Sequence, residues 1–249
     1  MQPITIWDLP TRIFHWLFAL GISCALVIGL GVDDDSDLYP LHMICGLFAM
    51  ALVILRIGWG LIGSRYSRLG TFVPRPGQVL SYLKGAFSGA TPTEPGRNPA
   101  SAYTTLAMMC FALALTVSGL AMTQGFRIKE IHEIFAYLML AVIVVHLAGL
   151  LNQALRCKDG VWQSMFSGKV SGEPVAALPS ARPVAGFLFL LVGLFCAGIL
   201  WSNYDTAGKV LTIPFSSSRI SLGENEKHNK SGVRADHHHE HENDDGEDN

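Results

Sequence analysis

The chain has 249 residues, of which 50% are hydrophobic and 15% are charged, and its formal net charge at pH 7 is −2. Soluble globular domains carry about 25% charged residues, and the mean hydropathy of this chain is positive, at +0.34. This balance excludes an ordinary water-soluble enzyme and a disordered chain, and the near-neutral charge excludes a basic nucleic-acid-binding protein. Five cysteines are present, but no Cys-x-x-Cys-His motif, which excludes covalently attached haem.

Five apolar runs along the chain each approach the roughly 20 residues that cross a bilayer as a helix. Backbone groups in lipid must pair within their own segment, so each run is predicted to be helical. The runs cover residues 13–32, 41–63, 102–123, 131–155 and 183–202. The first run lacks a signal-peptidase site before Asp33, and we expect it to be retained. The sequence therefore predicts an all-α membrane protein in which a four-helix transmembrane bundle is joined by a fifth transmembrane helix.

The loops between these runs differ in their content of Lys and Arg. Loops on the side of the N-terminus carry ten of these residues, and loops on the other side carry two before the C-terminal tail. Because positive loops stay on the cytoplasmic side, we expect a cytoplasmic N-terminus. Five spans then place the C-terminus in the periplasm, for a protein of the bacterial inner membrane.

The segments outside the runs contain no soluble domain. Residues 74–87 carry apolar positions near Lys84 and predict a short helix on the cytoplasmic surface, and residues 88–99 form a turn-rich link. The tail at 203–249 is polar and is predicted to be disordered; residues 236–249 alone hold four histidines and seven acidic residues. Candidate ligands for a divalent metal ion in this tail, with a merely solubilising role as the alternative, are His237, His238, His239 and His241.

Four further histidines all lie within the predicted membrane helices. Ionisable residues inside a membrane are costly and usually mark function. The alternating direction of the helices predicts His15 and His146 near the cytoplasmic face, and His42 and His132 near the outer face. His132 and His146 are 14 residues apart, which is about 21 Å along one side of a helix. One helix therefore supplies a histidine at each depth, and two other helices supply the second histidine of each pair.

Two histidine pairs at two depths are the arrangement expected of two bis-histidine haems inside a four-helix bundle. Zinc prefers three or four converging ligands, which two distant pairs do not provide. A proton relay would require carboxylates at intermediate depth, whereas Glu133 lies at the outer edge. Gly46, one turn after His42, would let a flat macrocycle approach the helix, although such glycines also serve in helix packing.

Arg56 follows His42 by 14 residues and is predicted at the depth of the inner haem. An arginine inside a span requires a partner, and the neighbouring spans offer no carboxylate at this depth. A haem propionate would suit the planar guanidinium. The alternative is a side chain that extends to the lipid headgroups.

Several motifs resemble those of the bacterial cytochrome b561 family, which includes the cytochrome b subunits of nickel–iron hydrogenases. They are Trp7-Asp8-Leu9-Pro10-Thr11-Arg12 followed by His15-Trp16, His42-x-x-x-Gly46, Arg56 with Trp59-Gly60, Phe72-x-Pro74, Gly96-Arg97-Asn98-Pro99, and the His132/His146 pair. The resemblance spans roughly residues 4–170 and implies a haem-binding domain at 1–175. It also implies two b-type haems, the same four histidines as ligands, and electron exchange with a quinone pool or a redox partner.

The sequence thus predicts a di-haem b-type cytochrome that carries electrons between a quinone pool and a redox partner. Iron with two axial histidines has no open position, which favours electron transfer over oxygen chemistry. Two interpretations stay open: an electron-transfer component and a quinol oxidoreductase in its own right. The alternative is a membrane anchor and electron-transfer subunit for a periplasmic hydrogenase-like enzyme or a c-type cytochrome, and a distant one is a non-redox histidine-containing transporter or sensor. No nucleic acid is expected as a partner.

Overall fold

A computed structural model of the chain describes residues 2–34, 36–72, 75, 77–81, 84, 99–157, 160–212 and 219–222. Its main elements are five long helices: α1 (Leu9–Gly31), α2 (Tyr39–Ile62), α5 (Pro99–Thr123), α6 (Lys129–Cys157) and α8 (Pro183–Ser202). All five are long and apolar enough to cross a membrane. The predicted all-α architecture is therefore confirmed, and the first four helices begin two to four residues earlier than the apolar runs.

Helix α1 begins before its apolar run because Asp8 caps it. The Oδ1 atom of Asp8 accepts a hydrogen bond from the backbone N–H of Thr11 at 3.1 Å, and Pro10 occupies the first turn, where its missing N–H costs nothing. Helix α2 also carries a proline, Pro40, in its first turn. Hydropathy alone does not detect such polar or proline-containing first turns, so it places the helix starts too late.

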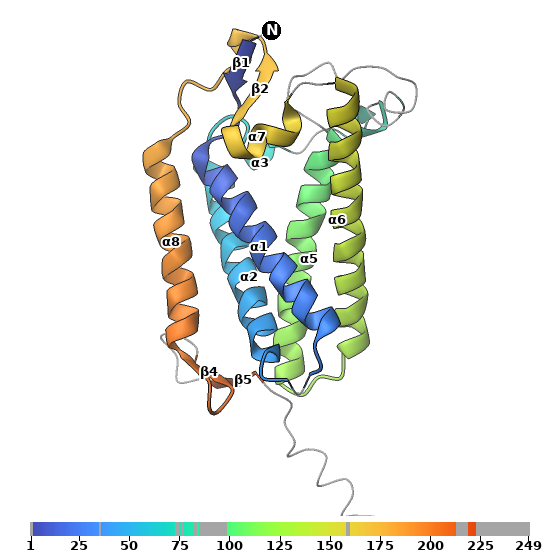
Figure 1. The fold of residues 1–249 in the computed structure, drawn as a ribbon, viewed down its shortest axis with the longest axis vertical. Helices are drawn as coiled ribbons and strands as arrows, with labels where there is room; N and C mark the ends of the chain where they lie inside the picture. The colour runs from blue at the N-terminus through green and yellow to red at the C-terminus, as the bar shows by residue number, and fades with distance from the viewer. Residues whose placement is uncertain are drawn as a thin grey trace, which may run out of the picture.

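Helices α1, α2, α5 and α6 form the bundle, and α8 lies beside α1 and α2 on the side away from α6 (Figure 1). The core between them holds Phe14, Phe18, Leu52, Met109 and Met139, together with Phe189 from α8. Gly186 lets α8 approach α1 closely, since a Cβ atom there would overlap the Leu9 side chain. The fifth helix is thus packed against the bundle.

Short elements close the two ends of the bundle, which we call the upper and lower ends as they appear in Figure 1. The upper end carries the antiparallel pair β1 (Gln2–Thr5) and β2 (Lys169–Gly172). It also carries the short helices α3 (Leu69–Phe72) and α7 (Ser164–Ser167) and two single 3-10 turns at Val161–Gln163 and Pro174–Ala176. The lower end carries a three-stranded antiparallel sheet of β3 (Tyr204–Asp205), β4 (Val210–Thr212) and β5 (Arg219–Ser221), with β4 in the middle.

This lower sheet departs from the disorder predicted for residues 203–249. Leu211, Ile220 and Leu222 are buried against α2, α5 and α8, so the tail begins with a folded segment. The average composition of the tail conceals these few alternating apolar residues, which is the physical reason for the wrong expectation over 203–212 and 219–222. The predicted helix at 74–87 and the link at 88–99 lie largely outside the described residues, and so do the four histidines proposed as metal ligands, His237, His238, His239 and His241.

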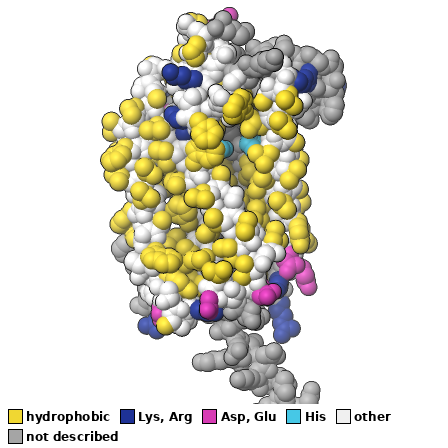
Figure 2. Space-filling view, viewed as in Figure 1, with side chains coloured by type: hydrophobic (Ala, Val, Ile, Leu, Met, Phe, Trp, Pro, Cys, Tyr) yellow, Lys and Arg dark blue, Asp and Glu magenta, His cyan; other side chains and the backbone are white. Residues whose placement is uncertain are grey.

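One face of the outer surface divides into an apolar band and two charged ends (Figure 2). Figure 2 shows hydrophobic side chains over the middle of one face, with the charged side chains near its top and bottom. At the lower end, Lys129 lies 2.6 Å from Asp34, and Lys209 lies 2.9 Å from Asp37. An apolar band of this kind is typical of a protein that is embedded in the lipid bilayer.

Candidate functional site

His42 of α2 and His132 of α6 face each other in the lower half of the bundle. Their ring centroids are 6.1 Å apart and the ring planes are inclined by 70°. The Nδ1 atom of His42 lies 2.7 Å from the Ala25 carbonyl oxygen, and that of His132 lies 2.9 Å from the Ser118 hydroxyl. With Nδ1 engaged in a hydrogen bond, Nε2 is the ring nitrogen that can bind a metal.

The spacing of these two rings is close to that of two ligands of a single metal ion. A metal–imidazole bond is about 2.0–2.1 Å and a ring centre lies about 1.2 Å behind its nitrogen, so two opposed ligands place the centroids roughly 6.4–6.6 Å apart. The observed 6.1 Å is a few tenths of an ångström shorter, so a small outward shift of the rings would place a metal ion between them. A cavity adjoins both rings, and His42 and His132 are part of its lining.

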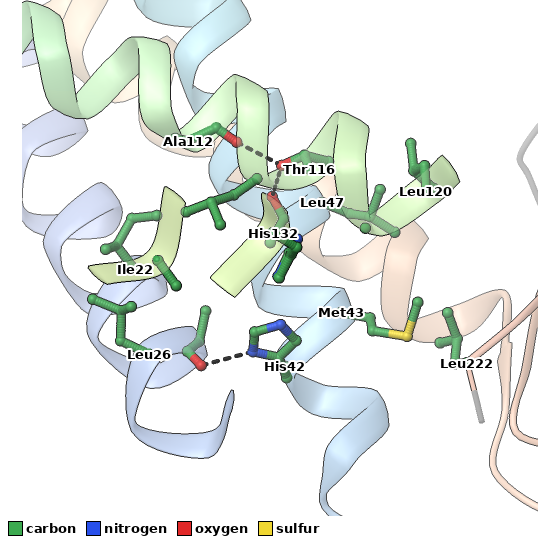
Figure 3. Close-up of a pocket in the computed structure, with 15 residues that line it drawn as sticks. Ile22, Leu26, His42, Met43, Leu47, Ala112, Thr116, Leu120, His132 and Leu222 are labelled. Carbon is green, nitrogen blue, oxygen red and sulfur yellow. Dashed lines mark hydrogen bonds between the residues drawn. The ribbon is translucent and has the colours of Figure 1, made fainter. Parts of the chain in front are cut away.

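The cavity is lined by side chains from all four bundle helices and from the segment after β5 (Figure 3). Its lining is almost entirely apolar and includes Ile22, Leu26, Met43, Leu47, Leu120 and Leu222. Gly46 also lines it, and a Cβ atom there would meet nothing within 4 Å. The polar exception, Thr116, donates its hydroxyl to the backbone oxygens of Ala112 and Gly46. A flat, largely apolar group therefore fits beside the two histidines.

Two neighbours fix the orientation of the His42 ring. A Cβ atom on Gly29 of α1 would lie 2.7 Å from Cε1 and Nδ1 of His42, so the ring packs directly on the glycine backbone. The Tyr39 ring stacks on His42 with centroids 5.5 Å apart. The sequence analysis did not single out Gly29, although a signal existed: it follows His15 by 14 residues, the interval that separates His132 from His146.

His15 of α1 and His146 of α6 lie in the upper half and are close enough to interact electrostatically. The Nδ1 atom of His146 lies 2.9 Å from the Thr104 hydroxyl on α5. The Nδ1 atom of His15 is buried and has no hydrogen-bond partner among the residues that the structure describes. Burying a ring nitrogen without a hydrogen-bond partner costs free energy. The His15 ring is therefore a candidate for binding a further group.

The structure thus brings the four predicted histidines together as two pairs. Both pairs include a residue of the continuous helix α6, and the 14 residues between its two histidines correspond to about 21 Å. Over the described ranges, no group of three or more His, Cys, Asp or Glu side chains could hold a metal ion. Paired histidines beside an apolar cavity suit haem iron better than zinc.

A buried polar network at the upper end surrounds Asp8. Its carboxylate is fully buried, and Oδ2 accepts hydrogen bonds from the Ser67 hydroxyl at 2.7 Å, from Trp59 Nε1 at 3.1 Å and from the Ser64 backbone N–H at 3.3 Å. Arg56 is 2% exposed. It donates Nη1 to the Ser67 carbonyl oxygen at 3.0 Å and is attracted by the Asp8 carboxylate.

Asp8 is therefore a carboxylate partner for Arg56 that was not apparent from the sequence, because Asp8 lies just outside the apolar run. Burial alone would raise the pKa of Asp8, but hydrogen bonds from Ser64, Thr11 and Ser67 outweigh burial and hold that pKa below its ordinary value. Asp8 is consequently ionised at neutral pH. Its negative charge compensates the buried guanidinium, which also lies 5.9 Å from the centre of the Phe14 ring.

A comparison with protein families finds that the family described as prokaryotic cytochrome b561 matches residues 6–168. A search of curated proteins and a search of solved structures found no match. The matched residues include all four intramembrane histidines, Arg56 and Asp8, whereas α8 and the lower sheet lie beyond the match. The chain belongs to the prokaryotic cytochrome b561 family and is an integral membrane b-type cytochrome that takes part in electron transfer.

Proposed function

We propose that the chain is a di-haem cytochrome that carries electrons across the bacterial inner membrane between a quinone pool and a redox partner. His42 and His132 hold one haem, and His15 and His146 hold the other. The observation that carries this proposal is the pairing of four histidines in two halves of one bundle. Bound haem supplies one-electron redox chemistry, and two axial histidines leave no position open for oxygen.

The protein's own residues would orient the two groups and keep water away from them. Ala25 and Ser118 hold the rings of the lower ligands through Nδ1, which leaves Nε2 for iron. Gly46 is the proposed contact for the lower macrocycle, supported by the open space at its Cβ position. Arg56 is the proposed partner of a propionate of the upper haem, supported by its burial and by the several N–H donors of a guanidinium.

The direction of the chain in the membrane follows from its charges. The loops on the side of the N-terminus carry ten Lys and Arg, and the N-terminal strand β1 lies at the upper end, so the upper end is proposed to face the cytoplasm and the lower end the periplasm. The two haem sites would then lie near opposite faces of the membrane. Electrons passing between them would cross most of the apolar core.

The donor is tested by adding a soluble quinol to the oxidised, purified chain without oxygen and recording the haem absorbance. We expect reduction of haem by the chain alone, because a quinone-linked cytochrome requires no other subunit for this step. Reduction that occurs only after a hydrogenase-like enzyme or a c-type cytochrome is added would instead support the role of a membrane anchor and electron-transfer subunit. Absence of reduction under both conditions would contradict a quinone-linked function.

The substitution Gly29→Ala should weaken the lower haem site selectively. The new methyl group would lie 2.7 Å from the His42 ring, closer than carbon atoms approach without displacement, so the ring must turn away from the Ala25 carbonyl. Loss of such an orienting contact typically lowers metal affinity by about 10- to 100-fold. We expect incomplete occupancy of one haem in the visible spectrum and full occupancy of the other.

The matched control is Gly31→Ala, two residues closer to the end of the same helix, where a Cβ atom would meet nothing within 4 Å. Both substitutions make the same change in helix propensity. Equal haem content in the two variants would contradict the role assigned to Gly29.

A further inference from the structure

We propose that the lower sheet is a cap that seals the His42/His132 site, so that residues beyond the family domain complete a haem site within it. The cap comprises residues 204–212 and 219–222, all of which follow the family match at 6–168. The inference rests on the proposed function in assigning a haem to that site. It adds a structural role, the exclusion of water from the site, which the histidine ligands do not imply.

Leu222 is the residue of the cap that reaches the site. Its side chain is 0% exposed and lines the same cavity as His42 and His132. Figure 3 shows Leu222 near Met43 at the edge of this cavity, and the cluster around Leu222 includes Met43 and Leu47 of α2 and Leu120 of α5. Leu222 therefore supplies apolar wall at the membrane-surface end of the pocket, where water would otherwise enter.

The cap is held in place at several independent points. The Leu222 backbone N–H donates to the Lys209 carbonyl oxygen at 2.7 Å, and that of Thr212 donates to the Asn203 carbonyl oxygen at 3.0 Å. Leu211 and Ile220 pair across β4 and β5 and are both buried. These contacts tie Leu222 to the end of α8, so its position over the cavity is set by folded structure.

The turn between β3 and β4 and one ion pair strengthen this attachment. Asp205 accepts a hydrogen bond from the Ala207 backbone N–H at 3.1 Å, and Lys209 adopts a positive φ of 48°, as expected of a tight turn. The Lys209 ammonium lies 2.9 Å from Asp37 in the loop between α1 and α2. The cap is thereby joined to the loop that precedes His42.

Sealing the site has a defined electrochemical consequence. The oxidised haem carries one positive charge more than the reduced haem, so contact with water favours the oxidised form. Apolar walls that exclude water therefore raise the reduction potential. Over the described ranges, the sheet lies at the end of the bundle opposite to the upper site, which is in the half that contains β1 and β2 (Figure 1). The cap should thus act on one of the two haems and leave the other unaffected.

The test compares Leu222→Ser with Leu222→Met in the full chain. Serine removes the apolar plug without adding charge, whereas methionine keeps an apolar side chain of similar volume. Each is combined with Met43→Cys, and labelling of residue 43 by a water-soluble maleimide is followed by peptide mass spectrometry, which separates it from the native cysteines. We expect labelling about tenfold faster or more with serine, because deleting a buried leucine side chain favours local opening by at least that factor.

The second readout is a redox titration of Leu222→Ser and Leu222→Met with the native Met43. The potential of the haem that His42→Ala removes should be lower with serine, and the potential of the other haem should be the same in both. Equal labelling rates, or equal potentials at the lower haem, would overturn the cap. Faster labelling in a chain that binds a single haem would support the cap and contradict the di-haem function, so the two failures are distinguishable.

Discussion

Replacing His42 by alanine should remove one haem from each chain and leave the other in place. The His42 and His132 rings are 6.1 Å apart and form one site, while the other pair lies about 21 Å along α6. Sites this far apart with no shared ligand behave almost independently. The haem content, measured as the pyridine haemochrome, should fall to half of the wild-type value, and the remaining haem should keep its visible spectrum.

The reciprocal variant His15→Ala should also lose half of the haem, but it should retain the spectrum that His42→Ala loses. Ile44→Ala serves as a matched control, because Ile44 is on the same helix and packs against the lower sheet without lining the cavity. It should retain both haems. Loss of both haems, or of neither, in His42→Ala would contradict the assignment of His42 to a separate lower site.

The second large effect is expected at Asp8. In Asp8→Asn, the amide NH2 would face either the Thr11 N–H or the donors of Ser67, Trp59 and Ser64, and the buried guanidinium of Arg56 would lose its negative neighbour. Breaking a buried charge pair together with its hydrogen bonds costs on the order of 3 kcal/mol. We therefore expect a clearly lower midpoint of thermal unfolding in detergent, with the helices still present by circular dichroism below it.

The same carboxylate should make the wild-type protein sensitive to acid. Because its pKa is lowered in the folded state, the stabilisation from Asp8 is complete above the unfolded pKa of about 3.9. It is lost as the pH falls through the lower, folded pKa. The stability difference between wild type and Asp8→Asn should shrink in that range. The exposed Asp33→Asn is the matched control, and an Asp8→Asn variant as stable as Asp33→Asn would contradict a structural role for the network.

The membrane fold and the histidine pairs could be predicted from the sequence because both depend on simple periodic geometry. Long uncharged runs identify the spans. The alternating direction of consecutive spans sorts His15 and His146 from His42 and His132. The 14-residue interval in α6 then places its two histidines on one side of the helix. The structure brings the residues together as this geometry requires.

The features that escaped prediction all depend on contacts between distant parts of the chain. Asp8 and Arg56 come near each other through Ser67, to which both are hydrogen-bonded, because residues 64–67 fold back onto the start of α1. Gly29 acquires its role from the ring of His42 on another helix. Leu222 is an apolar residue in a polar tail, and its burial is evident only once β5 is paired and set against α2 and α5. Apart from the 14-residue interval between His15 and Gly29, composition and spacing carry no record of such tertiary partners.

The central claim, two haems on two histidine pairs, is tested most directly by the haem count of the intact wild-type chain. The purified protein would be titrated electrochemically while its haemochrome is quantified against chain concentration. We predict two non-covalent b-type haems per chain and two one-electron steps, one of which disappears in His42→Ala. A fully loaded chain that holds a single haem, or a single one-electron step, would contradict the claim.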